Sequence, residues 1–158
     1  MQGMAVMGIR LADRKSFYNA VYSEFQRMDG LVIRALSMLG EQCVRYARER
    51  SAQDSWIDRT GNLRSSIGYV IVKGRRIVSM SSFDTVKGGG EGSSTGKKLA
   101  EDLGAMFPND YALVVVAGMN YAEYVEAMDN KDVLASPELF VRKKLPGMLV
   151  KLKNQIMR

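Results

Sequence analysis

The sequence predicts a single α+β domain over residues 1–158, with an antiparallel β-sheet packed against a long N-terminal helix and a C-terminal helix. The first observation is that long stretches with helical spacing of apolar residues lie towards the two ends of the chain, while β-branched segments occupy the middle. The second is that 158 residues, 46% of them hydrophobic, are enough to build one buried core. Helices first, strands next and a helix last is the order typical of this fold class.

The N-terminal region has the pattern of a long amphipathic helix. Asp13 can cap a helix over residues 14–28, and residues 31–50 repeat their apolar side chains at helical steps of three and four. Asp29-Gly30 marks a break or a kink, so the pattern allows either one helix or two. Cys43, the only cysteine, falls on the apolar stripe and is expected to be a small core residue rather than a reactive thiol.

Three strands are expected in the middle of the chain. Residues 68–73 are β-branched, residues 74–75 supply a turn, and residues 76–83 return as an alternating partner strand. Residues 111–117 form the most apolar segment, which predicts that this strand is central in the sheet.

A long connection of residues 84–109 separates the second and third strands. Its glycine-rich part, residues 87–96, cannot pack into the core, so residues 84–109 are expected to be a flexible insertion. The hypothesis is that this insertion is an arm that orders on assembly. Residues 97–107 can form a short amphipathic helix. A phosphate-binding loop is disfavoured, because Glu91 stands where a Walker-type loop needs glycine and Lys98 where it needs serine or threonine.

The last part of the chain is predicted to be mostly helical. A short helix over residues 121–128 and a small edge strand near residues 132–134 come first. Ser136 is then expected to cap a final helix that has Pro137 at its first helical position and runs to about Met157, and Pro146 should kink or split that helix.

Most of the net charge of +6 lies in this final segment. Residues 137–158 carry Arg142, Lys143, Lys144, Lys151, Lys153 and Arg158 against one acid, Glu138, so six minus one gives +5. A solvated helix face explains such a cluster, and a contact with an acidic protein surface or with DNA is the functional alternative. The candidate partner contacts are Arg142, Lys143, Lys144 and Lys151.

Composition argues against most catalytic classes. The chain has no histidine, which removes Ser-His-Asp and Cys-His arrangements and nearly every zinc site. Glu123 and Glu126 lie three residues apart on a predicted helix without a third acidic neighbour, so a solvated face or an intersubunit ion pair explains them better than acid–base chemistry. The sequence therefore predicts no catalytic residue, no cofactor, no metal site and no small-molecule substrate. It also predicts no membrane segment and no secretory signal.

Two short segments stand out from this background. The first runs from Arg59 to Ile67, where the Thr60 hydroxyl can cap a short turn and Gly61 lets the chain bend sharply. Leu63 and Ile67 should then face inward, while Arg64 faces outward, pairs with an acid or binds an anion. The second segment, residues 121–126, reads Tyr-Ala-Glu-Tyr-Val-Glu and follows the last strong strand.

Together these segments resemble the tail-completion or neck proteins of long-tailed bacteriophages, in which a Thr-Gly-x-Leu-Arg-x-Ser-Ile segment precedes a Tyr-Ala-x-Tyr-x-Glu segment. The residues that match the two motifs are Thr60, Gly61, Leu63, Arg64, Ser66, Ile67, Tyr121, Ala122, Tyr124 and Glu126. Pro137 and Phe140 loosely match a third. The chain departs from the pattern where Arg59 replaces the usual aspartate, where residues 127–130 lack the usual glycine, and in the glycine-rich insertion.

The resemblance implies a structural protein of the head–tail junction that acts in tail completion or head–tail joining. Its expected partners are further copies of itself in a ring and neighbouring neck or tail proteins, with possible transient contact with DNA. Its expected location is the virion, and the host bacterial cytoplasm during assembly. Two alternatives stay open: a basic nucleic-acid-binding module and, with less support, an enzyme that uses carboxylate or lysine chemistry.

Overall fold

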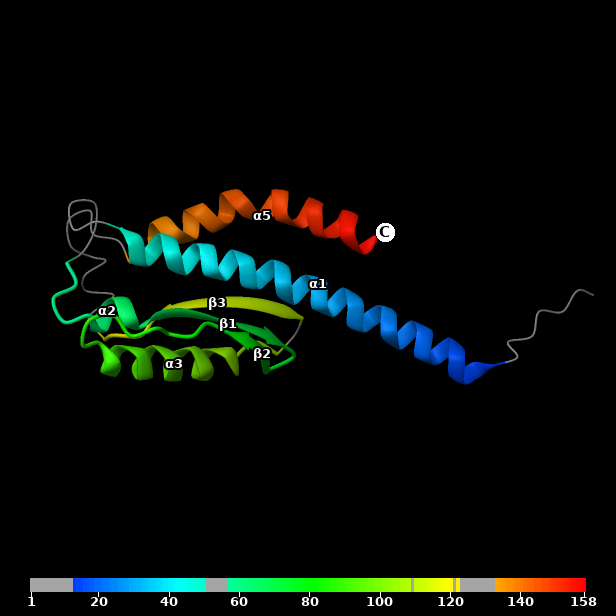
Figure 1. The fold of residues 1–158 in the computed structure, drawn as a ribbon, viewed down its shortest axis with the longest axis horizontal. Helices are drawn as coiled ribbons and strands as arrows, with labels where there is room; N and C mark the ends of the chain where they lie inside the picture. Colours follow the sequence, from blue (N-terminus) through cyan, green and yellow to red (C-terminus); the bar gives the residue numbers. More distant parts are fainter. Residues whose placement is uncertain (1–12, 51–56, 109, 121, 123–132) are drawn as a thin grey trace, which may run out of the picture.

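The computed structural model describes residues 13–50, 57–108, 110–120, 122 and 133–158. It confirms the predicted α+β class, with a long N-terminal helix, a three-stranded antiparallel sheet and a C-terminal helix. The elements form layers in which α5 lies on α1, α1 lies on one face of the sheet, and α3 covers the opposite face (Figure 1).

Helix α1, Arg14–Glu49, is one continuous helix, which decides between the two arrangements that the sequence allowed. The Asp13 carboxylate accepts hydrogen bonds from the amides of Lys15 (3.1 Å) and Ser16 (3.2 Å), as the capping pattern predicts. Gly30 sits inside the helix without breaking it. Near this point Asp29 forms an ion pair with Lys73 and accepts a hydrogen bond from the Tyr111 hydroxyl, which anchors the middle of α1 to the end of the sheet.

The sheet consists of β1 (Ile67–Lys73), β2 (Arg76–Met80) and β3 (Tyr111–Ala117) in the order β2-β1-β3. Both neighbours of β1 run antiparallel to it. The prediction that the third strand is central is wrong: β1 is central, and β3 forms an edge. The apolar side chains of β3 are explained by the helices that cover its faces, and an edge strand that is covered in this way can be as apolar as a central one.

The hairpin between β1 and β2 is closed by Gly74 and Arg75, which both have positive φ angles, 54° and 66°. Two such residues in a two-residue loop are the signature of a tight hairpin turn of type I′. The second strand ends at Met80, before the predicted residue 83. Phe83, three residues beyond the strand, has a φ of 51° and is buried at 4% exposure.

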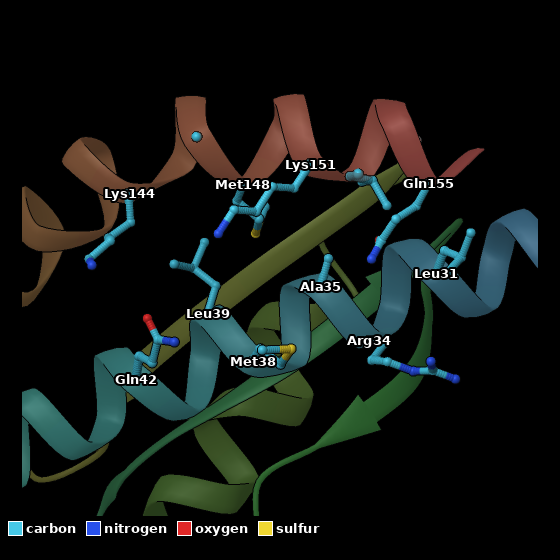
Figure 2. Close-up of a pocket in the computed structure, with 12 residues that line it drawn as sticks. Leu31, Arg34, Ala35, Met38, Leu39, Gln42, Lys144, Met148, Lys151 and Gln155 are labelled. Atoms are coloured by element: carbon cyan, nitrogen blue, oxygen red, sulfur yellow. The ribbon is translucent and has the colours of Figure 1, made fainter. Parts of the chain in front are cut away.

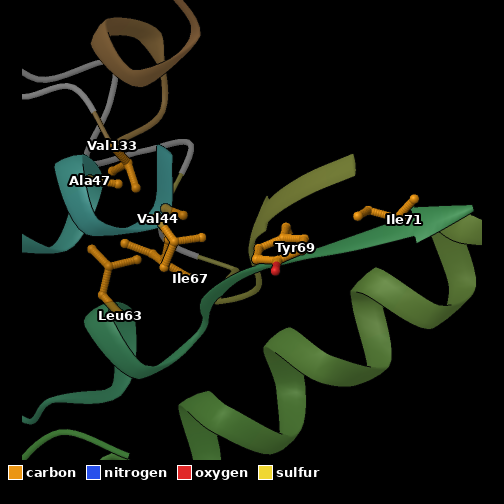
Figure 3. Packing of buried hydrophobic residues seen from close by; sticks show 8 residues of the cluster. Val44, Ala47, Leu63, Ile67, Tyr69, Ile71 and Val133 are labelled. Carbon is orange, nitrogen blue, oxygen red and sulfur yellow. The ribbon is translucent and has the colours of Figure 1, made fainter. Parts of the chain in front are cut away.

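The core has two halves, one on each face of β1. Ile67, Tyr69 and Ile71 point toward α1 and pack with Val44 and Ala47 (Figure 3). On the opposite face the residues in the cluster are Val70, Val72, Phe83, Ala100 and Val116. This alternation is the period of two that a strand imposes, and it explains why every residue of β1 except Lys73 is buried.

Helix α3, Gly90–Gly104, corrects the prediction of a flexible insertion at 84–109. A helix was expected only from residue 97, but it begins within the glycine-rich stretch. Gly92, Gly96, Ala100 and Gly104 recur every four residues, and all four are buried on one face of the helix. Because these residues lack large side chains, the helix backbone packs directly against the Asn62–Ser66 segment and β1. The glycines therefore serve close packing and not mobility, so residues 90–104 cannot be a free arm.

Helix α5, Ala135–Ile156, begins two residues earlier than predicted, so Leu134 and not Ser136 is the capping residue, and Pro137 lies in the first turn. It continues through Pro146 and changes direction near its middle, which confirms the predicted kink (Figure 1). Val133 and Leu134 form a bend, so no strand exists at these two positions of the predicted edge strand. The predicted short helix over residues 121–128 lies outside the described residues, apart from Ala122.

Cys43 is 3% exposed, as expected for a core residue, and burial raises the pKa of its thiol from 9.0 to about 11.

At about pH 8 we expect modification of Cys43 by a thiol reagent to be about 100-fold slower than in the unfolded chain, because only the thiolate reacts. The pKa of the Cys43 thiol is higher in the folded protein than in the unfolded chain. The buried neutral thiol therefore adds to the stability of the fold fully below about pH 9, and this stabilisation is lost as the pH rises toward 11. The control is a Cys43→Ala, Ser16→Cys variant with an exposed thiol. Equal labelling rates for the two proteins would contradict the prediction.

Candidate functional site

A groove of about 370 Å³ lies between α1 and α5 (Figure 2). Its apolar surface includes Leu31, Ala35 and Leu39 from α1 and Met148 and Leu152 from α5. The outer part of this surface is open to solvent, since Met38, which also lines the groove, is 59% exposed.

The kink in α5 and the small residue that follows it shape this groove. Pro146 removes one backbone hydrogen-bond donor from the helix, and Gly147 presents no side chain toward α1. A Cβ on Gly147 would meet nothing within 4 Å, so the space beside this residue is open. The two helices are held together at one end of the groove by Arg27, which donates hydrogen bonds to the carbonyl oxygens of Gln155 (3.4 Å) and Ile156 (3.0 Å).

The groove is positively charged. Among the side chains described as lining it, the charged ones are Arg34, Lys144 and Lys151, and all three are basic. Figure 2 shows Lys144 and Lys151 on α5 and Arg34 on α1, with the Arg34 side chain extending away from α5. Lys144 also stacks its ammonium over the Phe140 ring, 5.6 Å from its centroid. An apolar floor with basic side chains around it suits an amphipathic acidic segment.

The structure divides the four predicted partner contacts into two pairs. Lys144 and Lys151 line the groove, whereas Arg142 and Lys143 do not. Arg142 instead forms an ion pair with Glu138 one turn earlier, at 2.7 Å. The residues of α1 that line the groove were not predicted from the sequence. Leu31, Ala35, Met38 and Gln42 nevertheless follow one another at helical steps of four, three and four. That second helical stripe is the signal that could have revealed it.

The first motif forms a tight structural junction. Gly61 has a φ of 85° and precedes the one-turn helix α2, Asn62–Ser65. The Gly61 amide donates to the Asp58 carboxylate (3.0 Å), and the Thr60 hydroxyl accepts from the Asn62 amide (3.3 Å). The predicted cap by Thr60 is thus present, with Asp58 as a second acceptor that the sequence did not reveal. Leu63 and Ile67 are buried, at 2% and 0% exposure, as expected.

The polar residues of this motif serve internal contacts. The Ser66 hydroxyl donates to the Leu63 carbonyl (2.7 Å) and accepts from the Gly118 amide (3.1 Å), which ties the turn to the end of β3. Arg64 pairs with Asp58, with 3.9 Å between Nε and Oδ2. Of the alternatives for Arg64, an ion pair with a nearby acid is therefore the one that is observed.

Arg48 is a residue whose role the sequence did not reveal. It falls off the apolar stripe of α1, but its guanidinium reaches over the motif and donates to the carbonyl oxygens of Ile67 (3.0 Å) and Asp84 (3.2 Å). Burial lowers the pKa of Arg48, although the Asp84 charge opposes that shift. Arg48 therefore joins the end of α1 to the start of β1 and to the segment after β2.

Of the second motif, Ala122 is described; it is buried at 7% exposure and belongs to the core cluster with Val44 and Ile67. Tyr121, Tyr124 and Glu126 lie outside the described residues. A second hollow, of about 510 Å³, adjoins the first motif and includes Asp58, Thr60, Asn62 and Glu91 in its lining. In the part of the chain that the structure describes, no group of three or more histidine, cysteine or acidic residues is placed to hold a metal ion.

Comparisons with known proteins identify no relative. The chain matches no protein-family model, and the searches of curated proteins and of solved structures give no match. None of the helices in the described ranges has both the length and the apolar character needed to cross a bilayer.

Proposed function

We propose that this protein is a non-catalytic structural component of the head–tail junction of a long-tailed phage or prophage. In this proposal it acts in tail completion or head–tail joining, by assembling as a ring and binding neighbouring neck or tail proteins. The observation that carries the proposal is the ordered pair of motifs in the sequence. The geometry of the first motif supports a structural role, because Gly61 and Ser66 form hydrogen bonds within the junction and Leu63 and Ile67 are buried in it.

The groove between α1 and α5 supplies the partner-binding surface in this proposal. Its apolar floor can bury one face of a helix, and Arg34, Lys144 and Lys151 can pair with acidic side chains beside that face. The occupant is an acidic amphipathic segment of a neighbouring junction protein. The virion, and the host cytoplasm during assembly, are the corresponding locations.

The proposal is tested by interrupting the gene in the parent phage and examining the lysate by negative-stain electron microscopy. Full heads and tails that lie unjoined are expected, and normal joined particles would reject the neck function. A plasmid copy of the wild-type gene should restore joined particles.

The same complementation experiment tests the groove. We expect the Lys144→Glu, Lys151→Glu variant to lower the titre of infectious particles by about tenfold or more, because like charges then face an acidic partner. The matched control is Lys143→Glu, Lys153→Glu, which makes the same change in net charge at two exposed positions of α5 outside the groove. Equal titres for the two variants would show that the groove is not the contact surface.

DNA binding is the second candidate function, and the basic surface of α5 is the observation that favours it. It requires that the purified protein bind duplex DNA with an affinity that falls steeply as salt is raised. If such binding is found and the interrupted phage still makes joined particles, the nucleic-acid function replaces the neck function.

A further inference from the structure

The N-terminal part of α1, residues 14–26, is a helical extension that leaves the body of the protein. In Figure 1 this part of the helix runs past the end of the sheet and past the C-terminal end of α5. Residues 13–27 are all exposed. The last contacts with the body are those of Arg27 with the end of α5 and of Asp29 with Lys73 and Tyr111.

The extension carries large apolar side chains on one face. Phe17, Tyr18, Tyr22 and Phe25 are 49%, 66%, 65% and 58% exposed, with Val21 among them at 36%. With about 200 Å² per aromatic side chain, the four rings leave about 500 Å² of surface in water. A patch of that size is as large as the largest on most monomeric proteins and commonly marks a binding surface.

This face continues the stripe by which α1 packs on the sheet. Tyr18, Tyr22, Phe25, Asp29, Ile33 and Leu36 follow one another at helical steps of three and four. The later members of the series, Ile33 and Leu36, pack against the core cluster. The aromatic face therefore has the pattern of a buried helix face. The sheet ends at Lys73 and Tyr111, which contact Asp29, so it does not extend far enough to cover this face.

We propose that a second copy of this chain covers the extension, with the two extensions packed antiparallel about a two-fold axis near Val21. Phe17 and Phe25 lie four residues on either side of Val21, so antiparallel pairing brings Phe17 of each copy against Phe25 of the other. Two copies would together bury about 1,000 Å², which is the lower limit for a stable specific interface.

The shape of the protein selects the antiparallel direction. Tyr18, Tyr22 and Phe25 lie on the stripe of α1 that faces the sheet, so a parallel neighbour on this face would run into the sheet of the first copy. An antiparallel neighbour places its own body on the far side of Arg14, away from the sheet and from α5 of the first copy (Figure 1). This inference does not depend on the phage assignment. A two-fold contact closes on itself, so the proposed ring would use other faces.

The first test is the molar mass of the purified full chain, measured by sedimentation at up to about 100 μM, above the micromolar Kd expected of a small interface. We expect a dimer, and we expect Phe17→Gln, Phe25→Gln to raise its Kd by about 100-fold or more. Both positions are exposed and outside the core, so the variant should fold. The control is Leu149→Gln, Val150→Gln, which removes apolar side chains of α5 that are 51% and 60% exposed. A monomeric wild type, or equal dimerisation of the two variants, would overturn the proposal.

The second test fixes the direction of pairing. Phe17→Cys and Phe25→Cys variants are made separately and oxidised alone or as an equal mixture. Antiparallel pairing predicts a disulfide-linked dimer in the mixture and little in either variant alone, because identical positions are then about 12 Å apart along the helices. Linkage that is as fast in each variant alone as in the mixture would overturn the antiparallel arrangement.

Discussion

Replacing Gly96 with alanine should lower the free energy of unfolding by about 2–3 kcal/mol, although alanine is the better helix former. A Cβ at this position would lie 2.3 Å from the carbonyl oxygen of Ser66 and 2.8 Å from its Cα, and these are backbone atoms that cannot rotate away. Forcing a methyl group into such a contact costs about 3 kcal/mol. The higher helix propensity of alanine returns at most about 1 kcal/mol.

The matched control is Gly30→Ala, which makes the same substitution inside α1. Nothing lies within 4 Å of a Cβ at Gly30, so here only the helix propensity changes. We expect a gain of about 0.5–1 kcal/mol. Urea unfolding followed by circular dichroism measures both variants. If Gly96→Ala proved as stable as the wild type, α3 would not pack against the motif as closely as described.

The position of Gly96 explains why the first motif and the glycine-rich stretch belong to one unit. Gly96 meets the backbone of Ser66 on one side, and a Cβ on Gly118 would come within 2.4 Å of the Gly96 Cα. Ser66 itself bonds to the Gly118 amide. The turn of the motif, the helix α3 and the end of β3 therefore meet at a point where only small residues fit.

This junction also shows where prediction from the sequence stops. Periodicity revealed α1, the hairpin and α5 because their burial patterns follow the geometry of single elements. It failed at residues 87–96, since a glycine that permits close packing and a glycine that permits flexibility look the same in a sequence. The same limit applies to the site. The basic residues of α5 are evident in the sequence, but only packing shows that Lys144 and Lys151 line one groove together with Arg34 of α1.

The second large effect is expected for Ile71→Ala, with a loss of about 3–4 kcal/mol in the free energy of unfolding. Ile71 is 0% exposed in the central strand and belongs to the cluster between the sheet and α1. Removing three carbon atoms there costs their transfer free energy and leaves a cavity, because the strands on both sides hold the backbone in place.

Ile77→Ala provides the control, since it is the same change in the neighbouring edge strand at a side chain that is 37% exposed. Its loss should be about 1 kcal/mol, because less apolar surface is involved and water can fill the space. Thermal and urea unfolding of the two variants measure the difference. Equal losses would mean that β1 is not the strand on which both halves of the core depend. A loss of about 3–4 kcal/mol at Ile71 with only about 1 kcal/mol at Ile77 would show that the buried face of β1 contributes more to the stability of the domain than the edge strand β2.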